Sequence, residues 1–112
     1  MVLKQISEEE IYLNELNNEN DWYDLSTNYS LTEDIIEEFQ NQVNWKLISI
    51  NQKLSESFIE KFQNKVDWLF VSKYQKLSED FIEKYKDKVN WRLIGNNQDI
   101  SKEFKEKYHC MF

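Results

Sequence analysis

Residues 54–76 read LSESFIEKFQNKVDWLFVSKYQK, and residues 77–99 read LSEDFIEKYKDKVNWRLIGNNQD. The two segments align without a gap, so the chain contains an internal repeat of 23 residues. The period extends to both sides of this pair, because tryptophan recurs at the same phase in Trp22, Trp45, Trp68 and Trp91. A fixed period of this length is typical of proteins that stack one small structural unit on the next.

Each unit contains the start of a first helix. Ser55 is the predicted N-cap, since its hydroxyl can accept a hydrogen bond from an unpaired amide of the first turn. Glu56 follows at once and suits the positive end of the helix dipole. Leu54 and Ile59 have the spacing of a hydrophobic staple across this start. The equivalent caps are Thr32, Ser78 and Ser101, and the first unit has the staple pair Ile6 and Ile11.

A second, shorter helix begins directly before each tryptophan. Its predicted N-caps are Asp21, Asn44, Asp67 and Asn90. About two turns follow, ending near Asn51, Tyr74 or Asn97. We expect asparagine to close these helices in the left-handed conformation, because the chain has only one glycine and no proline. A helix this short must be stabilised by packing against neighbouring units.

These patterns predict an all-α fold, a short α-solenoid of helix–turn–helix units with about nine short helices in one domain. The units are residues 6–30, 31–53, 54–76 and 77–99, followed by a capping half-unit 100–112. The first unit is two residues longer, with the insertion placed in residues 17–20. A compact bundle of the same helices is the competing fold, but a bundle does not require identical spacing. Lys105 replaces an apolar staple residue in the half-unit, as expected of a cap whose outer face is polar.

The sequence offers no catalytic constellation. Its single histidine, His109, and its single cysteine, Cys110, are neighbours at the end of the chain and are not expected to face a shared substrate. Two such ligands do not make a metal site, and no other residues have zinc-ligand spacing. The only glycine, Gly95, falls in a short helix, so a phosphate-binding loop is excluded. We therefore expect no enzyme activity, no metal and no cofactor.

The net charge of −7 is unevenly distributed. Residues 1–56 have three basic and twelve acidic side chains, whereas residues 57–112 have eleven basic and nine acidic ones. The acidic half favours a partner with a basic surface. A basic cluster from Lys84 to Arg92 is interrupted by Asp87, and the acidic chain opposes phosphate binding, so no direct contact with nucleic acid is expected.

Composition also predicts the compartment. One cysteine cannot form an intramolecular disulfide, which fits a reducing environment. The chain begins without the pattern of a signal peptide, and no apolar run has the length of a membrane span. These features predict a soluble cytoplasmic protein without membrane association.

The pattern LSExFIxxF…VxWxxI resembles short tryptophan-containing helical repeats in proteins of large DNA viruses and phages. The resemblance spans nearly the whole chain and implies the helical-repeat fold. The first unit departs from it by its insertion and by Asp24, which stands where later units have Leu47, Phe70 and Leu93. Because the shared residues are mostly structural, the resemblance implies the fold more than any particular activity.

Large side chains that break the repeat are candidates for a binding surface, since the packing of every unit does not require them. They are Tyr12, Tyr23, Tyr29, Ile50, Leu69 and Tyr74. Two of these tyrosines lie close in sequence to acidic residues, where aromatic anchors would combine with negative charge. The candidate partner-binding residues are therefore Tyr23, Asp24, Tyr29, Glu33, Asp34, Glu37 and Glu38.

The functional hypothesis is a non-enzymatic protein-interaction module, encoded by a virus or phage, that binds and inhibits a host factor. In a narrower version, the acidic half imitates a nucleic-acid backbone and occupies the basic groove of a host defence nuclease such as a CRISPR effector. The alternative is a structural protein that forms homodimers or larger assemblies through its repeat ends, with Phe112 exposed.

Overall fold

The computed structural model describes the backbone of residues 4–5 and 19–112 and the side chains from Asp21 onward. Within these ranges the chain forms two short strands, eight α-helices and one 3₁₀ helix. Their bounds are β1 Lys4–Gln5, α2 Glu19–Asn28, β2 Tyr29–Ser30, α3 Glu33–Glu38, α4 Trp45–Asn51, α5 Glu56–Lys61, α6 Trp68–Tyr74, α7 Glu79–Lys84, α8 Trp91–Asn97, α9 Lys102–Lys107 and the 3₁₀ helix His109–Met111. Two features predicted from the sequence, the staple between Ile6 and Ile11 and the outward position of Tyr12, lie outside the described residues.

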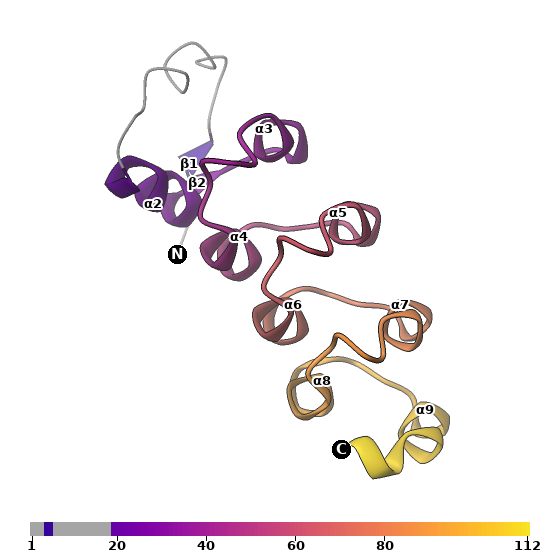
Figure 1. The fold of residues 1–112 in the computed structure, drawn as a ribbon. Coiled ribbons are helices and arrows are strands. Elements are labelled where there is room, and N and C mark those ends of the chain that lie inside the picture. The colour runs from indigo at the N-terminus through magenta and orange to yellow at the C-terminus, as the bar shows by residue number, and fades with distance from the viewer. Residues whose placement is uncertain (1–3, 6–18) are drawn as a thin grey trace.

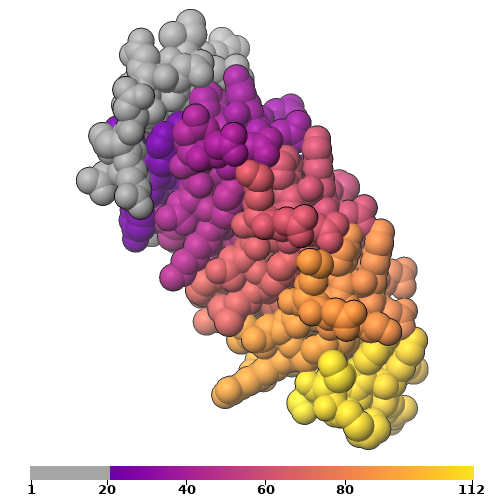
Figure 2. Space-filling view, viewed as in Figure 1, coloured from indigo at the N-terminus to yellow at the C-terminus, as the bar shows by residue number. Residues whose placement is uncertain are grey.

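The helices alternate between two parallel rows (Figure 1). The tryptophan row contains α2, α4, α6 and α8, and each of these helices packs directly on the next. The glutamate row contains α3, α5, α7 and α9. Successive units follow one another along the long axis as bands of colour in the space-filling view (Figure 2), and the principal extents are 50 × 27 × 21 Å. The elongated, unit-by-unit arrangement confirms the solenoid and not the compact bundle.

The predicted helix starts are confirmed wherever the repeat is regular. The Ser55 hydroxyl accepts a hydrogen bond from the Phe58 amide at 3.2 Å, and the Asn44 side chain accepts one from the Leu47 amide at 3.1 Å. The prediction for Asp21 is wrong, because α2 already begins at Glu19 and Asp21 lies within its first turn. Glu19 and Asn20, from the segment to which the insertion was assigned, extend α2 toward the N-terminus, and an acidic residue is favourable throughout the first turn of a helix.

The tryptophan-row helices end where expected but by a different mechanism. Among the described residues, no residue other than glycine has a positive φ angle, so the predicted left-handed asparagine is wrong. Instead, Gln52 leaves the helix in an extended conformation, with φ −97° and ψ 147°, while its amide still bonds to Ile48. The Asn51 side chain donates to the Leu47 carbonyl at 3.1 Å and so folds back against the last turn.

The core is a continuous column between the two rows. Its fully buried members recur at two phases of the repeat and are Ile36, Ile48, Ile59, Val71, Ile82 and Ile94. The tryptophans pack inward as predicted: the Trp68 ring lies 5.3 Å from the Tyr85 ring, and its indole N–H donates to the Gln63 carbonyl at 2.8 Å. Burial of these side chains supplies the main stabilisation of helices that are too short to be stable alone.

A ladder of glutamine side chains joins successive units. The Gln75 Oε1 atom accepts a hydrogen bond from the Leu54 amide at 2.9 Å. Its Nε2 atom donates to the carbonyls of Ser49 and Gln52 at 2.9 and 2.6 Å. Gln52 and Gln98 each make the equivalent three bonds, at their own places in the stack. Each glutamine therefore pairs the first amide of its own unit and two backbone carbonyls of the preceding unit.

The strands are the one feature of the fold that the repeat does not predict. β1 and β2 form a parallel two-residue ladder in which Lys4 pairs with Tyr29 and Gln5 with Ser30. Two residues are too few to give the alternating pattern by which a strand is found in a sequence.

Candidate partner-binding surface

One column of carboxylates on the glutamate row binds the N-caps of successive units. The Glu33 carboxylate accepts hydrogen bonds from the Ser55 amide at 2.7 Å and from the Ser55 hydroxyl at 3.0 Å. Glu56 and Glu79 bind Ser78 and Ser101 in the same way. Each carboxylate thus supports the N-cap of the next unit, and it is not free to bind a partner without disturbing the stack.

A second column of carboxylates on the same row forms ion pairs. Glu37 pairs with Lys61 at 2.5 Å, Glu60 with Lys84, and Glu83 with Lys107. The hydrogen bond from Lys84, followed by one from the Tyr85 hydroxyl, holds the pKa of Glu60 below its ordinary value. The same two kinds of donor, Lys107 and Tyr108, lower the pKa of Glu83. These ion pairs neutralise much of the negative charge that the sequence places on this row.

The structure distributes the seven predicted binding residues over both rows. Tyr23 and Asp24 lie on the exposed side of α2 in the tryptophan row, where the Asp24 carboxylate accepts a bond from Asn28 at 2.7 Å. Tyr29 lies in β2 and packs against the core. The remaining four residues, Glu33, Asp34, Glu37 and Glu38, lie on α3 in the glutamate row.

Of the four carboxylates on α3, two contact the next unit and two do not. Glu33 and Glu37 make the contacts described above, whereas Asp34 and Glu38 are exposed. The acidic surface left for a partner on α3 is therefore smaller than its sequence, EDIIEE, suggests.

A different surface appears on the outer side of the tryptophan row. Helix α6 exposes Leu69 and Tyr74, at 45% and 50% of their full accessible surface. Phe70 and Lys73 lie on the same side, because positions i, i+1, i+4 and i+5 share one face of a helix. Val71 and Ser72 fall on the opposite side and are fully buried. The repeat thus fixes which α6 side chains point to solvent.

Basic and aromatic side chains contact one another on this surface. The Lys46 ammonium group of α4 lies 5.4 Å from the centre of the Phe70 ring, and Lys73 lies 5.2 Å from that of Tyr74. The Phe70 and Tyr74 rings are stacked, with centroids 6.1 Å apart. We call the five residues Lys46, Leu69, Phe70, Lys73 and Tyr74 the α6 face.

The three helices that form and flank the α6 face contain basic residues and no acidic ones. Helices α4, α6 and α8 read WKLISIN, WLFVSKY and WRLIGNN, so they contain Lys46, Lys73 and Arg92 and no acidic residue. Leu69 and Tyr74 are large residues that break the repeat, and both are exposed in the structure. Phe70 and the lysines were not predicted, although the absence of carboxylates from these three segments is visible in the sequence.

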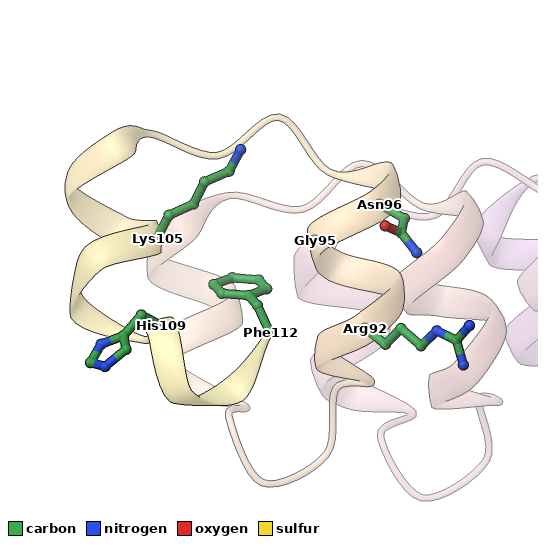
Figure 3. Close-up of a pocket in the computed structure, with 6 residues that line it drawn as sticks. All are labelled: Arg92, Gly95, Asn96, Lys105, His109 and Phe112. Atoms are coloured by element: carbon green, nitrogen blue, oxygen red, sulfur yellow. The ribbon is translucent and has the colours of Figure 1, made fainter.

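The end of the stack formed by α8, α9 and the 3₁₀ helix has a shallow pocket of about 410 Å³ (Figure 3). It is lined by Arg92, Gly95, Asn96, Lys105, His109 and Phe112. The Phe112 ring lies in the middle of the labelled side chains, over Gly95 (Figure 3). The lining is basic and aromatic and has no carboxylate.

His109 and Cys110 come closer together than the sequence analysis expects. The Cys110 Sγ atom lies 3.3 Å from His109 Nε2, and both residues are exposed on the 3₁₀ helix. A nucleophile also needs a group that orients its base, and the His109 Nδ1 atom faces only the Glu106 backbone carbonyl at 3.2 Å. In the part of the chain that the structure describes, no group of three His, Cys, Asp or Glu side chains could hold a metal ion.

None of the helices in the described ranges is long and apolar enough to cross a membrane. A comparison of the chain with known protein families, with curated proteins and with solved structures gives no match.

Proposed function

We propose that this protein is a non-catalytic interaction module that binds an acidic region of a partner protein through the α6 face. The observation that supports this proposal is the exposure of Leu69 and Tyr74 beside Phe70, on helices that contain only basic charges. Exposed aromatic and apolar side chains at the centre of a polar surface are typical of binding sites.

The variability of these positions within the repeat supports a role other than packing. The phase occupied by Leu69 holds Tyr23, Lys46 and Arg92 in the other units, whereas the phases of the bonding glutamines and of the tryptophans are nearly constant. A position that tolerates four different side chains in one stack is not constrained by the stack. An exposed leucine at such a position lowers the solubility of the protein and makes none of the hydrogen bonds between units.

Charge complementarity defines the kind of partner. Lys46, Lys73 and Arg92 would attract carboxylates, and the rings of Phe70 and Tyr74 offer apolar area between them. A nucleic acid would meet the same basic groups, but it has a charge at every phosphate, so the net charge of −7 opposes it more strongly than a protein segment with a few carboxylates. The proposal therefore names an acidic protein segment with apolar side chains.

The test is affinity capture from a host lysate with the tagged full chain and a double variant, Leu69→Ser with Tyr74→Ser. Both side chains are exposed, so the variant should remain folded, which circular dichroism checks. The proposal expects a specific protein partner that the wild type retains and the variant loses. The matched control is Asp34→Asn with Glu38→Gln on the opposite row. Loss of the partner by the control, and not by the α6 variant, would overturn the assignment.

The acidic surface of α3 is a second candidate, supported by the exposure of Asp34 and Glu38. Its partner would be a basic protein, and the hypothesis of a viral or phage inhibitor of a host defence nuclease, such as a CRISPR effector, depends on it. The structure narrows the test to these two residues, because neutralising Glu33 or Glu37 would also break inter-unit bonds. This candidate predicts capture of a nuclease that decreases as salt rises and is abolished by the Asp34→Asn, Glu38→Gln variant.

For both candidates we propose the cytoplasm of a host cell as the compartment. The thiol of Cys110 is free and exposed, and such a group stays reduced in that compartment. Oxidising conditions would instead link two chains through this residue. Mass analysis of the protein recovered from cells, without reducing agent, distinguishes the two situations.

A further inference from the structure

In each inner unit, three side-chain positions lie on the side where the following unit packs. At the first, the hydroxyl oxygen of a buried serine accepts a backbone amide, as from Asp67 to Ser49 at 3.0 Å. At the second, a glutamate binds the next N-cap, as Glu56 binds Ser78. At the third, an isoleucine such as Ile59 is fully buried. These positions define the face on which each new unit stacks.

At the C-terminal end of the stack, the last copy of each of these three positions has a different residue. The serine phase, Ser26, Ser49 and Ser72, continues as Gly95, which has no hydroxyl. The glutamate phase, Glu33, Glu56 and Glu79, continues as Lys102, which cannot accept a hydrogen bond. The isoleucine phase, Ile36, Ile59 and Ile82, continues as Lys105, whose side chain is exposed.

A fourth position of the repeat also changes at this end, and its larger side chain covers the surface between α8 and the 3₁₀ helix. The buried valines Val43, Val66 and Val89 are followed at the same phase by Phe112. The Phe112 ring lies edge-on to Trp91 at 5.5 Å and covers Gly95 so closely that a Cβ atom there would be 2.8 Å from Cδ1 of the ring (Figure 3). Gly95 and Phe112 are therefore matched: the larger ring requires the absence of a side chain beneath it.

We propose that Gly95, Lys102, Lys105 and Phe112 form a stop that prevents a second copy of this chain from stacking on the α8–α9 end. A unit placed there would find neither acceptor and would meet the Phe112 ring. It would also bury the ammonium group of Lys105 where inner units bury isoleucine, which is unfavourable without a partner for the charge. A solenoid that presents repeat-like faces can otherwise associate head to tail without closing.

The residues of the inner units supply the test. A variant with Gly95→Ser, Lys102→Glu, Lys105→Ile and Phe112→Val restores the inner face while the rest of the chain is unchanged. The control variant, Lys86→Glu with Lys88→Gln, makes the same change in net charge at exposed positions of the preceding turn. Sedimentation velocity is measured for the three proteins over a wide concentration range, with circular dichroism to check folding.

The proposal expects the wild type and the control to sediment as monomers at every concentration. The restored variant should self-associate reversibly, with its average mass rising about twofold or more. A folded restored variant that stays monomeric would overturn the proposal, as would association of the wild type over the same range. If the four changes prevent folding, the pair Lys102→Glu and Lys105→Ile, both at exposed positions, tests the part of the stop that the two lysines supply. This pair should self-associate more than the wild type at the highest concentrations, and a folded pair variant as monomeric as the wild type would overturn the role of the lysines.

Discussion

The glutamine ladder makes a quantitative prediction about what holds the units together. In Gln75→Met, the side chain keeps a similar shape but loses its three hydrogen bonds, to the Leu54 amide and to the carbonyls of Ser49 and Gln52. Gln75 is only 5% exposed, so water cannot easily replace the lost partner. The substitution therefore leaves one donor and two acceptors unpaired in the interior.

The same change at Gln98 is an internal control. Gln98 makes the equivalent three bonds, but it is half-buried and water can take over its role. A buried hydrogen bond contributes about 1 kcal/mol net, so we expect Gln75→Met to lower the free energy of unfolding by about 3 kcal/mol. For Gln98→Met we expect a loss of about 1 kcal/mol, because solvated groups lose little when a partner is removed.

The assay is equilibrium unfolding in urea, followed by far-UV circular dichroism and tryptophan fluorescence. A pure loss of stability shifts the midpoint and leaves the dependence on denaturant unchanged. If the two variants lose the same free energy, burial does not determine the contribution of the glutamines. If Gln75→Met loses less than about 1 kcal/mol, the ladder does not hold the units together, and the reasoning above is wrong.

Three further predictions follow from side chains outside the ladder. The lowered pKa of Glu60 means that its ionised carboxylate stabilises the fold above its ordinary pKa of 4.5, and that this contribution is lost as pH falls through the folded-state value. The stability difference between wild type and Lys84→Met should therefore disappear on acidification in urea unfolding. Ser78→Ala removes the N-cap of α7 and a bond to Glu56, and it should cost about 1–2 kcal/mol in the same assay. Substitution of both His109 and Cys110 by alanine should leave stability and partner capture unchanged.

The first two of these predictions have matched controls. Lys76→Met removes an exposed lysine of the adjacent turn and should leave the acid dependence of stability as it is in the wild type. Ser57→Ala removes an exposed hydroxyl that caps no helix and should change stability by a few tenths of a kcal/mol. A loss of partner capture on removing the imidazole and the thiol would show that the 3₁₀ helix belongs to the binding site.

The parts of the fold that depend on local sequence could be predicted. The N-caps at Ser55 and Asn44 act on amides three residues away, so the signal and its effect lie in one short segment. The period of the tryptophans predicts the stacking, because identical units must meet through identical contacts. Local reasoning fails where the period is broken, as at Asp21, where an insertion changes the start of α2.

The parts that depend on contacts between units could not be predicted. Glu33 and Glu37 looked like free charges of an acidic surface, because their partners Ser55 and Lys61 lie 22 and 24 residues away. Likewise, Gln52 looked like a polar residue of a turn, and the sequence assigned helix termination to asparagine instead. A single sequence shows that a position recurs, but it does not show which neighbour the recurring side chain contacts.

The division between constrained and free positions also determines how binding could change without loss of the fold. Lys46, Leu69 and Arg92 occupy one phase on three successive helices, and each is compatible with the same inter-unit bonds beneath it. Side chains on the outer face of the tryptophan row can therefore be replaced by charged or apolar ones without loss of the bonds between units. A change at Glu33, in contrast, alters binding and stacking together. A surface of the first kind suits a module whose partner varies. This is the physical reason to look for the partner on the α6 face before the acidic surface of α3.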